Sequence, residues 1–259
     1  YFSDGEQQFE NHKSKNDLLE YFKSIEGSRA AKTESICKED FWELEEYLKE
    51  NFSNFTYANT LLPFVELISE RAVKSDISQK SQLYAPLWGL HQQFTDLYVR
   101  MMEALQVVNF CSELCASEAA LIPKAKSIID VQILRNITST NDDYIDVQCP
   151  NGDACTLPRS LLSAVTAELV LNISDVPHEF MMHTDVLDFP GARNREPVNL
   201  TDHFASFEDD GNKIHEYLIR GKVAYLFEKY VNSQDINAML LCIKHSNMEA
   251  IGLTTVVER

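Results

Sequence analysis

Apolar residues recur at intervals of three and four positions through the first half of the chain, which is the spacing of one face of an α-helix. This pattern predicts helices over about residues 16–27, 39–48, 57–73 and 84–107. The last is the strongest, since Leu87, Leu90, Phe94, Leu97, Tyr98, Met101 and Leu105 follow the spacing. We therefore expect residues 1–125 to form a helical region.

The pattern changes after about Pro123, where short segments rich in isoleucine and valine alternate with turn signals. Pro150-Asn151-Gly152 is a strong turn signal, and it predicts a hairpin between strands 144–148 and 154–157. Further expected elements are strands 128–134, 180–187 and 236–243, helices 158–171 and 219–230, and a polar loop over 194–212. This order predicts an α/β region with a parallel sheet over residues 126–259.

Charge and composition narrow the classes of protein. The 259 residues are 44% hydrophobic and 24% charged, which is the balance of a chain that buries a core. Lys and Arg number 23 against 40 Asp and Glu, so the net charge is −17 and nucleic acid is not an expected partner. No apolar run reaches the ~20 residues that would span a bilayer. Because the chain begins with Tyr1 rather than methionine, we expect it to be a piece of a longer protein.

The cysteines and tryptophans suggest no catalytic chemistry. Six cysteines include no C-x-x-C pair, so reduced thiols in a cytosol-like compartment are expected. Cys111 and Cys115 are expected to be small buried residues on one helix, and Trp42 and Trp88 to be core anchors.

A transition-metal site near His178 and His183, with Asp185 and Asp188, is conceivable. However, satisfied or surface histidines are favoured, because Asp188 would not share the strand face of His183 and Asp185.

The sequence Asp188-Phe189-Pro190-Gly191 follows an expected hydrophobic strand and precedes the polar loop. Asp188 could hold Mg²⁺ through a water molecule, and the Gly191 amide could approach a terminal phosphate because no side chain blocks it. An ordinary turn is the alternative interpretation. A phosphate-binding loop, G-x-x-x-x-G-K-[ST], is absent from the chain, so such a loop lies upstream or the segment binds no nucleotide.

Arg193, Arg195, Arg220 and Lys222 form a basic group in an acidic chain. Beside Asp188 they could contact a phosphate or the carboxylates of a partner, and solvated loop charges are the alternative.

Several segments resemble one protein family. Residues 184–193, 218–230 and 239–243, together with 84–89 and 161–171, are similar to the putative virulence factor family of Gram-negative bacteria typified by SrfC. The similarity extends from about Tyr84 to the end, whereas the helices before about Thr60 rest on periodicity alone.

This resemblance implies a P-loop GTPase-type (NTPase-like) core, incomplete in this chain, with a large helical amino-terminal or inserted region. It implies that Mg²⁺ and GTP or ATP bind at Asp188, Pro190 and Gly191 once an upstream phosphate loop is present, and that residues 192–212 form a nucleotide-sensitive switch. Ala192 stands where small GTPases often carry a water-orienting glutamine, so hydrolysis would be slow or would depend on Arg193, Arg195 or a partner.

The resemblance also implies protein partners in a virulence-associated complex, in the bacterial cytoplasm or after delivery to a host. The alternative function is a non-enzymatic interaction or scaffold module, in which the helical half docks other components and the Asp188–Gly191 turn is only structural.

Overall fold

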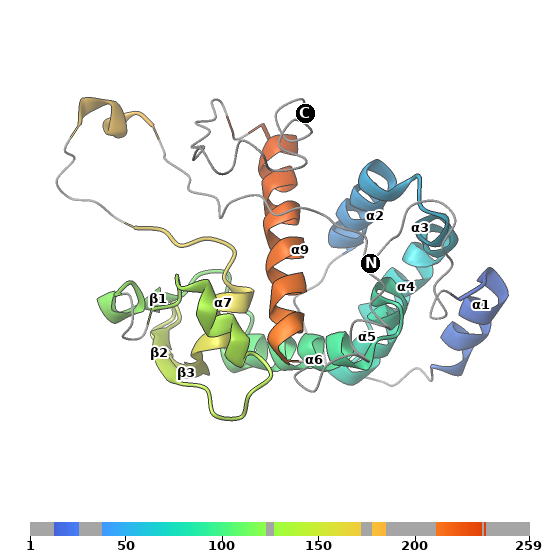
Figure 1. Cartoon of the computed structure of the whole chain (residues 1–259), viewed down its shortest axis with the longest axis horizontal. Coiled ribbons are helices and arrows are strands. Elements are labelled where there is room, and N and C mark those ends of the chain that lie inside the picture. The colour runs from blue at the N-terminus through green and yellow to red at the C-terminus, as the bar shows by residue number, and fades with distance from the viewer. Residues whose placement is uncertain are drawn as a thin grey trace. The chain divides into compact units, whose positions relative to one another are not determined.

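The computed structural model describes residues 13–25, 38–122, 127–171, 178–184, 211–234 and 236 (Figure 1). The chain divides into two compact units. Unit 1 comprises Tyr1–Thr166 and Pro197–His215, and unit 2 comprises Ala167–Glu196 and Glu216–Arg259.

Short helices make up the first part of unit 1. They are α1 (Lys15–Ser24), α2 (Lys38–Phe52), α3 (Thr56–Leu61), η1 (Leu62–Phe64), α4 (Val65–Ala72), α5 (Ile77–Tyr84), η2 (Ala85–Trp88) and α6 (Gln92–Val107), where η marks a 3₁₀ helix. The first predicted helix is confirmed as α1, and the second as α2, which is longer than predicted. Ser14 and Asp17 begin α1 with a capping box, because each side chain satisfies a backbone N–H of the other residue.

The long helix predicted over residues 84–107 is divided, so this prediction is wrong in part. Tyr84 ends α5, η2 follows, and α6 begins only at Gln92. Gly89 and Leu90 between them have φ angles of 66° and 62°, in the left-handed region. The N–H of Leu90 donates to the Ala85 carbonyl at 2.8 Å, which closes the turn. A left-handed glycine typically ends a helix, and here the apolar spacing continues across the break.

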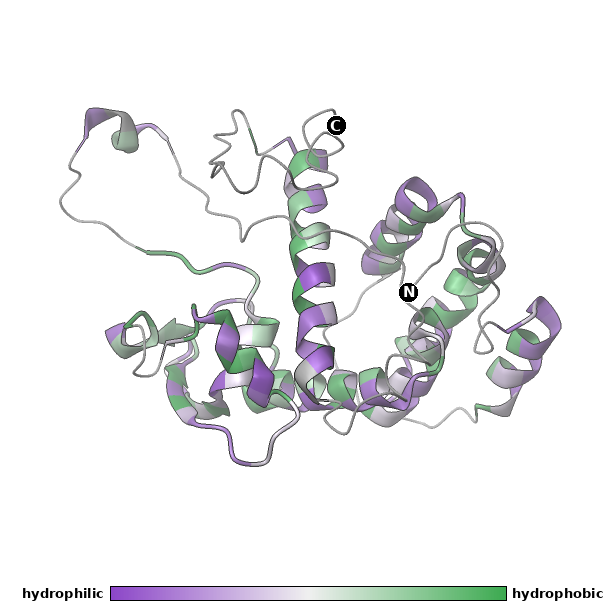
Figure 2. Cartoon of the chain, viewed as in Figure 1, coloured by the Kyte–Doolittle hydropathy of each residue, from purple (hydrophilic) through white to green (hydrophobic). Residues whose placement is uncertain are grey.

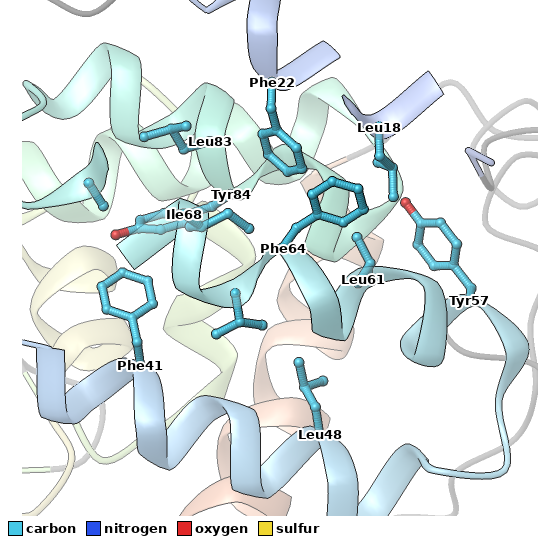
Figure 3. Packing of buried hydrophobic residues seen from close by; sticks show 12 residues of the cluster. Leu18, Phe22, Phe41, Leu48, Tyr57, Leu61, Phe64, Ile68, Leu83 and Tyr84 are labelled. Atoms are coloured by element: carbon cyan, nitrogen blue, oxygen red, sulfur yellow. The ribbon is translucent and has the colours of Figure 1, made fainter. Parts of the chain in front are cut away.

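One hydrophobic core holds the helical part of unit 1 together (Figure 3). The α1 side chain of Phe22 is fully buried, and its ring centroid lies 5.2 Å from that of Phe64. Phe41 of α2 lies 6.0 Å from Tyr84 of α5, again between ring centroids. Each large buried side chain contributes about 1.5–3 kcal/mol by leaving water, so these contacts fix α1, α2 and α5 around α3 and α4.

The sheet of unit 1 is small and antiparallel. It consists of β1 (Cys115–Ala116), β2 (Tyr144–Gln148) and β3 (Ala154–Pro158) in the order β1-β2-β3. The predicted hairpin is therefore confirmed, and its strands pair from Tyr144 opposite Pro158 to Gln148 opposite Ala154. Ile145, Val147 and Leu157 are buried, as the alternation of a half-buried strand requires.

Short helices accompany the sheet. They are η3 (Glu118–Ala120), η4 (Val131–Asn136) and α7 (Arg159–Val165). The last packs against η4, β3 and α6.

The predicted parallel sheet of a P-loop core is not present among the residues that the structure describes. Residues 131–134 of one expected strand lie in η4, because the Asp130 carboxylate accepts a hydrogen bond from the Gln132 N–H at 3.0 Å and starts a helical turn. Residues 180–182 of another expected strand lie in η5 (Glu179–Met182) of unit 2. The helix expected to reach residue 171 ends at Val165. Strand 236–243 lies outside the described residues except at its first position.

The helix predicted over residues 219–230 is confirmed, and it is longer. It is α9 (Gly211–Asn232), whose first residues belong to unit 1 and whose remainder belongs to unit 2. None of the helices in the described ranges is both long and apolar enough to cross a bilayer.

Candidate functional site

The residues predicted to bind nucleotide and magnesium lie outside the described residues. They are Asp188, Pro190 and Gly191, together with the predicted catalytic residues Arg193 and Arg195. His178 and His183, from the disfavoured metal site, are described and exposed. Among the residues with described positions, no three His, Cys, Asp or Glu side chains gather as a metal site would require.

Two of the four predicted basic residues, Arg220 and Lys222, lie on α9. Burial lowers the pKa of Lys222 to about 8. Burial raises the pKa of Tyr217, and the nearby Arg220 partly offsets this increase. Lys222 and Tyr217 are therefore partly withdrawn from water on α9.

A small cavity beside α7 is too small for a nucleotide. Ser127, Asp130, Ile133 and Arg159 line it, and its volume is about 50 Å³. Pockets for small molecules usually have volumes of ~300–1,000 Å³. Arg159 also pairs with Asp143 at 3.6 Å, so this guanidinium already has a carboxylate partner. The cavity can hold water but not a nucleotide.

The exposed face of α2 is a distinctive surface feature of the part of unit 1 that the structure describes. The Trp42 side chain is 62% exposed, so the prediction that it anchors the core is wrong. Exposed glutamates lie beside it: Glu39 and Glu46 are three residues before and four residues after Trp42, and Glu43 and Glu50 are each four residues further along from these two. We call these five residues the Trp42 face.

The opposite side of α2 fixes this helix to the core. Phe41 and Leu48 are each only 4% exposed and belong to the hydrophobic cluster, and Figure 2 shows hydrophilic and hydrophobic residues alternating around α2. Lys49 pairs with Glu45 one turn earlier on the helix. The Trp42 face is thus carried by an anchored helix.

The chemistry of the Trp42 face suits a cationic ligand. An indole ring attracts a guanidinium or ammonium group over its face, with a strength of about 0.5–1 kcal/mol at an exposed site. Carboxylates beside the ring can accept charge-assisted hydrogen bonds from the same group. A basic peptide segment is therefore the ligand that this arrangement fits best.

A second feature is a group of three cysteines at the end of α6, which we call the thiol cluster: Cys111, Cys149 and Cys155. The Cys149 Sγ donates to the Val108 carbonyl at 3.7 Å, and the Cys155 Sγ donates to the Val107 carbonyl at 3.4 Å. The pKa of Cys149 is raised to about 11. The larger cause is a hydrogen bond with the Cys111 side chain, and burial is the next.

The expectation that Cys111 and Cys115 share one helix is wrong. The helix α6 ends at Val107, and Asn109 and Phe110 have φ angles of 51° and 54°. These left-handed residues turn the chain, so Cys111 lies at the helix end and Cys115 lies in β1. All four cysteines of the described ranges are free thiols.

Sequence reasoning missed both features, although a signal existed for the Trp42 face and for part of the thiol cluster. The glutamate spacing around Trp42 could have indicated a solvated helix face. The predicted hairpin already placed Cys149 beside its turn and Cys155 in its second strand. Nothing local indicated that the end of α6 would meet them.

The class that the structure defines is a mainly helical protein with a small antiparallel sheet. A family model described as "Putative bacterial virulence factor" matches residues 1–259, and the chain belongs to that family. No curated protein and no solved structure gave a significant match.

Proposed function

We propose that this chain is a protein-interaction module of a virulence-associated assembly, and that the Trp42 face binds a basic segment of a partner protein. The observation that supports this most is the exposed Trp42 side chain set among glutamates on an anchored helix. An exposed tryptophan is unfavourable in water, and tryptophans recur as energetic anchors of protein interfaces.

The charge of the chain supports a basic partner. The net charge of −17 attracts cationic segments at long range and speeds their association. At short range the tryptophan ring provides a specific position for one arginine or lysine. Long-range attraction would speed the association of the basic segment, and the tryptophan would fix its position on α2.

Fluorescence anisotropy of a short fluorescein-labelled oligoarginine peptide tests the proposal. We expect binding that the double substitution Glu46→Lys and Glu50→Lys weakens at least tenfold, which is about 1.4 kcal/mol. Trp42→Ala should weaken binding by a smaller factor that remains measurable.

The matched control is Glu103→Lys with Glu113→Lys. Both glutamates are exposed on unit 1 away from α2, and the change in net charge is the same. Affinity for this variant should stay within about threefold of the parent, given the screening of distant charges at physiological salt. Equal weakening by the two double variants would show that net charge alone governs binding, and the Trp42 face would be rejected.

A nucleotide-dependent switch is a second candidate function, supported by the sequence Asp188-Phe189-Pro190-Gly191 followed by a polar loop. On this proposal Asp188 holds Mg²⁺ through water, Pro190 and Gly191 approach the nucleotide, and Arg193 or Arg195 stabilises the transferred phosphate. The phosphate-binding loop would be supplied upstream of Tyr1, so GTPase activity would belong to the longer protein.

This candidate is tested by titrating fluorescent GTP and ATP, with and without magnesium, on a polypeptide extended upstream of Tyr1. Magnesium-dependent binding that Asp188→Ala weakens tenfold would support the switch. Absence of binding to either nucleotide would exclude it.

A further inference from the structure

We propose that Cys111 and Cys149 form a reversible disulfide under oxidation, which covalently joins the end of α6 to the end of β2. This bond would make the thiol cluster a site of redox modification, separate from the Trp42 face and independent of the function proposed for it.

The two cysteines meet at one carbonyl oxygen. The Val108 oxygen accepts a hydrogen bond from the Cys111 N–H at 3.0 Å and another from the Cys149 Sγ at 3.7 Å. The backbone of one cysteine and the sulfur of the other are therefore within hydrogen-bond distance of the same atom. Disulfides need Cα atoms about 4.4–6.8 Å apart, and the proposal takes the two cysteines to come within that range in the folded chain.

A tight turn holds Cys111 in this position. Asn109 and Phe110 both adopt left-handed backbone angles, and the Phe110 N–H donates to the Leu105 carbonyl at 2.8 Å. Two consecutive left-handed residues other than glycine are unfavourable, so the turn persists only because surrounding contacts maintain it. The position of Cys111 is therefore set before any oxidation occurs.

The sheet favours Cys149 over the other cysteines as the partner of Cys111. By alternation along β2, Cys149 lies on the buried face together with Val147, and its side chain is 2% exposed. Cys155 is opposite Val147 and therefore shares that face, but its thiol contacts a different carbonyl, that of Val107. Cys115 is exposed and opposite Gln148, on the other face of the sheet.

Hydrogen peroxide is an oxidant that balances the reaction. The partly exposed Cys111 sulfur attacks one peroxide oxygen, the O–O bond breaks, and Cys111 sulfenic acid and one water form. The Cys149 sulfur then attacks the sulfenyl sulfur, the S–O bond breaks, and the hydroxide leaves with the Cys149 proton as a second water. In total, two thiols lose two electrons and two protons, and one peroxide becomes two waters.

The environment of Cys149 disfavours the first step, and its closeness to Cys111 serves the second. Its pKa is raised to about 11, so this buried thiol stays protonated near neutral pH and is a poor first target for peroxide. It can nevertheless resolve a sulfenic acid that forms next to it. A small dithiol such as dithiothreitol would reverse the bond by thiol–disulfide exchange.

The test is peptide mapping of the folded 259-residue chain. The reduced chain is treated with hydrogen peroxide, blocked with N-ethylmaleimide, and cleaved after glutamate and aspartate. Such cleavage separates the four cysteines into peptides 104–113, 114–118, 147–153 and 154–168. We expect peptide 104–113 linked to peptide 147–153, loss of two thiols from the six, and full recovery of both with dithiothreitol.

Two variants and one condition serve as controls. Cys115→Ser removes an exposed thiol on the other sheet face and should leave the link intact, whereas Cys149→Ala should abolish it. Circular dichroism must show that both variants remain folded. Oxidation in denaturing urea should give mixed links, because the folded geometry selects the pair.

The proposal is overturned if folded chain yields a link between any other two peptides. It is also overturned if Cys111 proceeds to sulfinic acid while Cys149 remains fully alkylatable, or if the link between peptides 104–113 and 147–153 forms equally well in urea.

Discussion

At the scale of single residues, burial separates two aromatic side chains that look alike in the sequence. Phe22 is fully buried against Phe64, whereas Trp42 is mostly exposed. Phe22→Ala should lower the free energy of unfolding by about 3–5 kcal/mol, because it removes apolar contacts and leaves a cavity. Urea denaturation monitored by circular dichroism measures this loss.

Trp42→Ala is the matched control for that experiment. A substitution on an exposed helix face should change the free energy of unfolding by about 0.5 kcal/mol or less. Comparable losses for the two variants would mean that Trp42 is a core residue in solution, and the Trp42 face would not exist.

Two buried tyrosines, Tyr57 and Tyr84, and the half-buried Tyr98 make the free energy of unfolding depend on pH in the alkaline range. Burial raises the pKa of Tyr57, Tyr84 and Tyr98 above the ordinary value of 10. Because the pKa of each phenol is higher in the folded chain than in the unfolded chain, the stabilisation by these phenols is complete below about pH 10. It is lost as the pH rises above about 10, where the phenols ionise in the unfolded chain but not in the folded chain. Each such phenol steepens the fall in the free energy of unfolding by up to about 1.4 kcal/mol per pH unit.

Urea titrations with reductant at several pH values between about 8 and 11 measure this slope. Tyr84→Phe should make the fall in the free energy of unfolding with pH shallower by the contribution of one phenol. Burial lowers the pKa of Lys80, which changes the slope in the opposite direction, but this contribution is the same in the parent and the variant and cancels when they are compared. Absorbance at 295 nm provides an independent readout. If all the phenols ionise together near pH 10 while the chain stays folded, the three hydroxyl groups are not shielded from water.

At the scale of elements, capping fixes where α5 begins. The Asp76 carboxylate accepts a hydrogen bond from the Gln79 N–H at 2.8 Å, and the Gln79 side chain accepts one from the Asp76 N–H at 3.3 Å. Asp76→Ala should lower the free energy of unfolding by about 1 kcal/mol, since it leaves helix N–H groups without a partner. Asp76→Ser keeps a capping oxygen while removing the same charge, so it should recover most of the loss. Equal losses for the two variants would assign the effect to charge.

Local signals determined which elements could be predicted. Short segments rich in isoleucine and valine around a Pro-Asn-Gly turn are sufficient to predict the β2–β3 hairpin, because register and turn both lie within a few residues. The strand predicted over residues 128–134 is wrong because a short apolar run suits a strand or a helix equally well, and the Asp130 side chain decides between them. The helix predicted over residues 84–107 failed at Gly89, where the left-handed backbone interrupts an apolar spacing that continues on both sides.

At the scale of the whole molecule, sites that depend on contacts between distant elements were not predictable. The thiol cluster brings the end of α6 to the β2–β3 hairpin, about 40 residues away in the chain, and no local pattern encodes that meeting. The sequence motif Asp188–Gly191 was found because its signal is local. Its role in binding nucleotide stays a prediction, since those residues lie outside the described ranges.

Because the net charge is −17, added salt should have opposite effects on the stability of this protein and on its affinity for a basic peptide. Between about 0.05 and 0.5 M NaCl, screening should weaken the repulsion among carboxylates and raise the midpoint of thermal unfolding. Over the same range, screening should weaken oligoarginine binding to the Trp42 face, since attraction between opposite charges drives it. Both curves can be measured on one preparation, by circular dichroism and by fluorescence anisotropy.

The Trp42→Ala variant separates the two contributions to binding. Its thermal midpoint should follow salt as the parent does, because the net charge is unchanged. Its oligoarginine affinity should be lower at every salt concentration by a constant factor, because a contact between a cation and a ring at close range is screened much less than distant charges are. If the parent and the variant converge at low salt and differ only at high salt, the attraction at low salt is non-specific. If the two curves coincide throughout, the tryptophan contributes nothing, and the exposed ring needs another explanation than a basic partner.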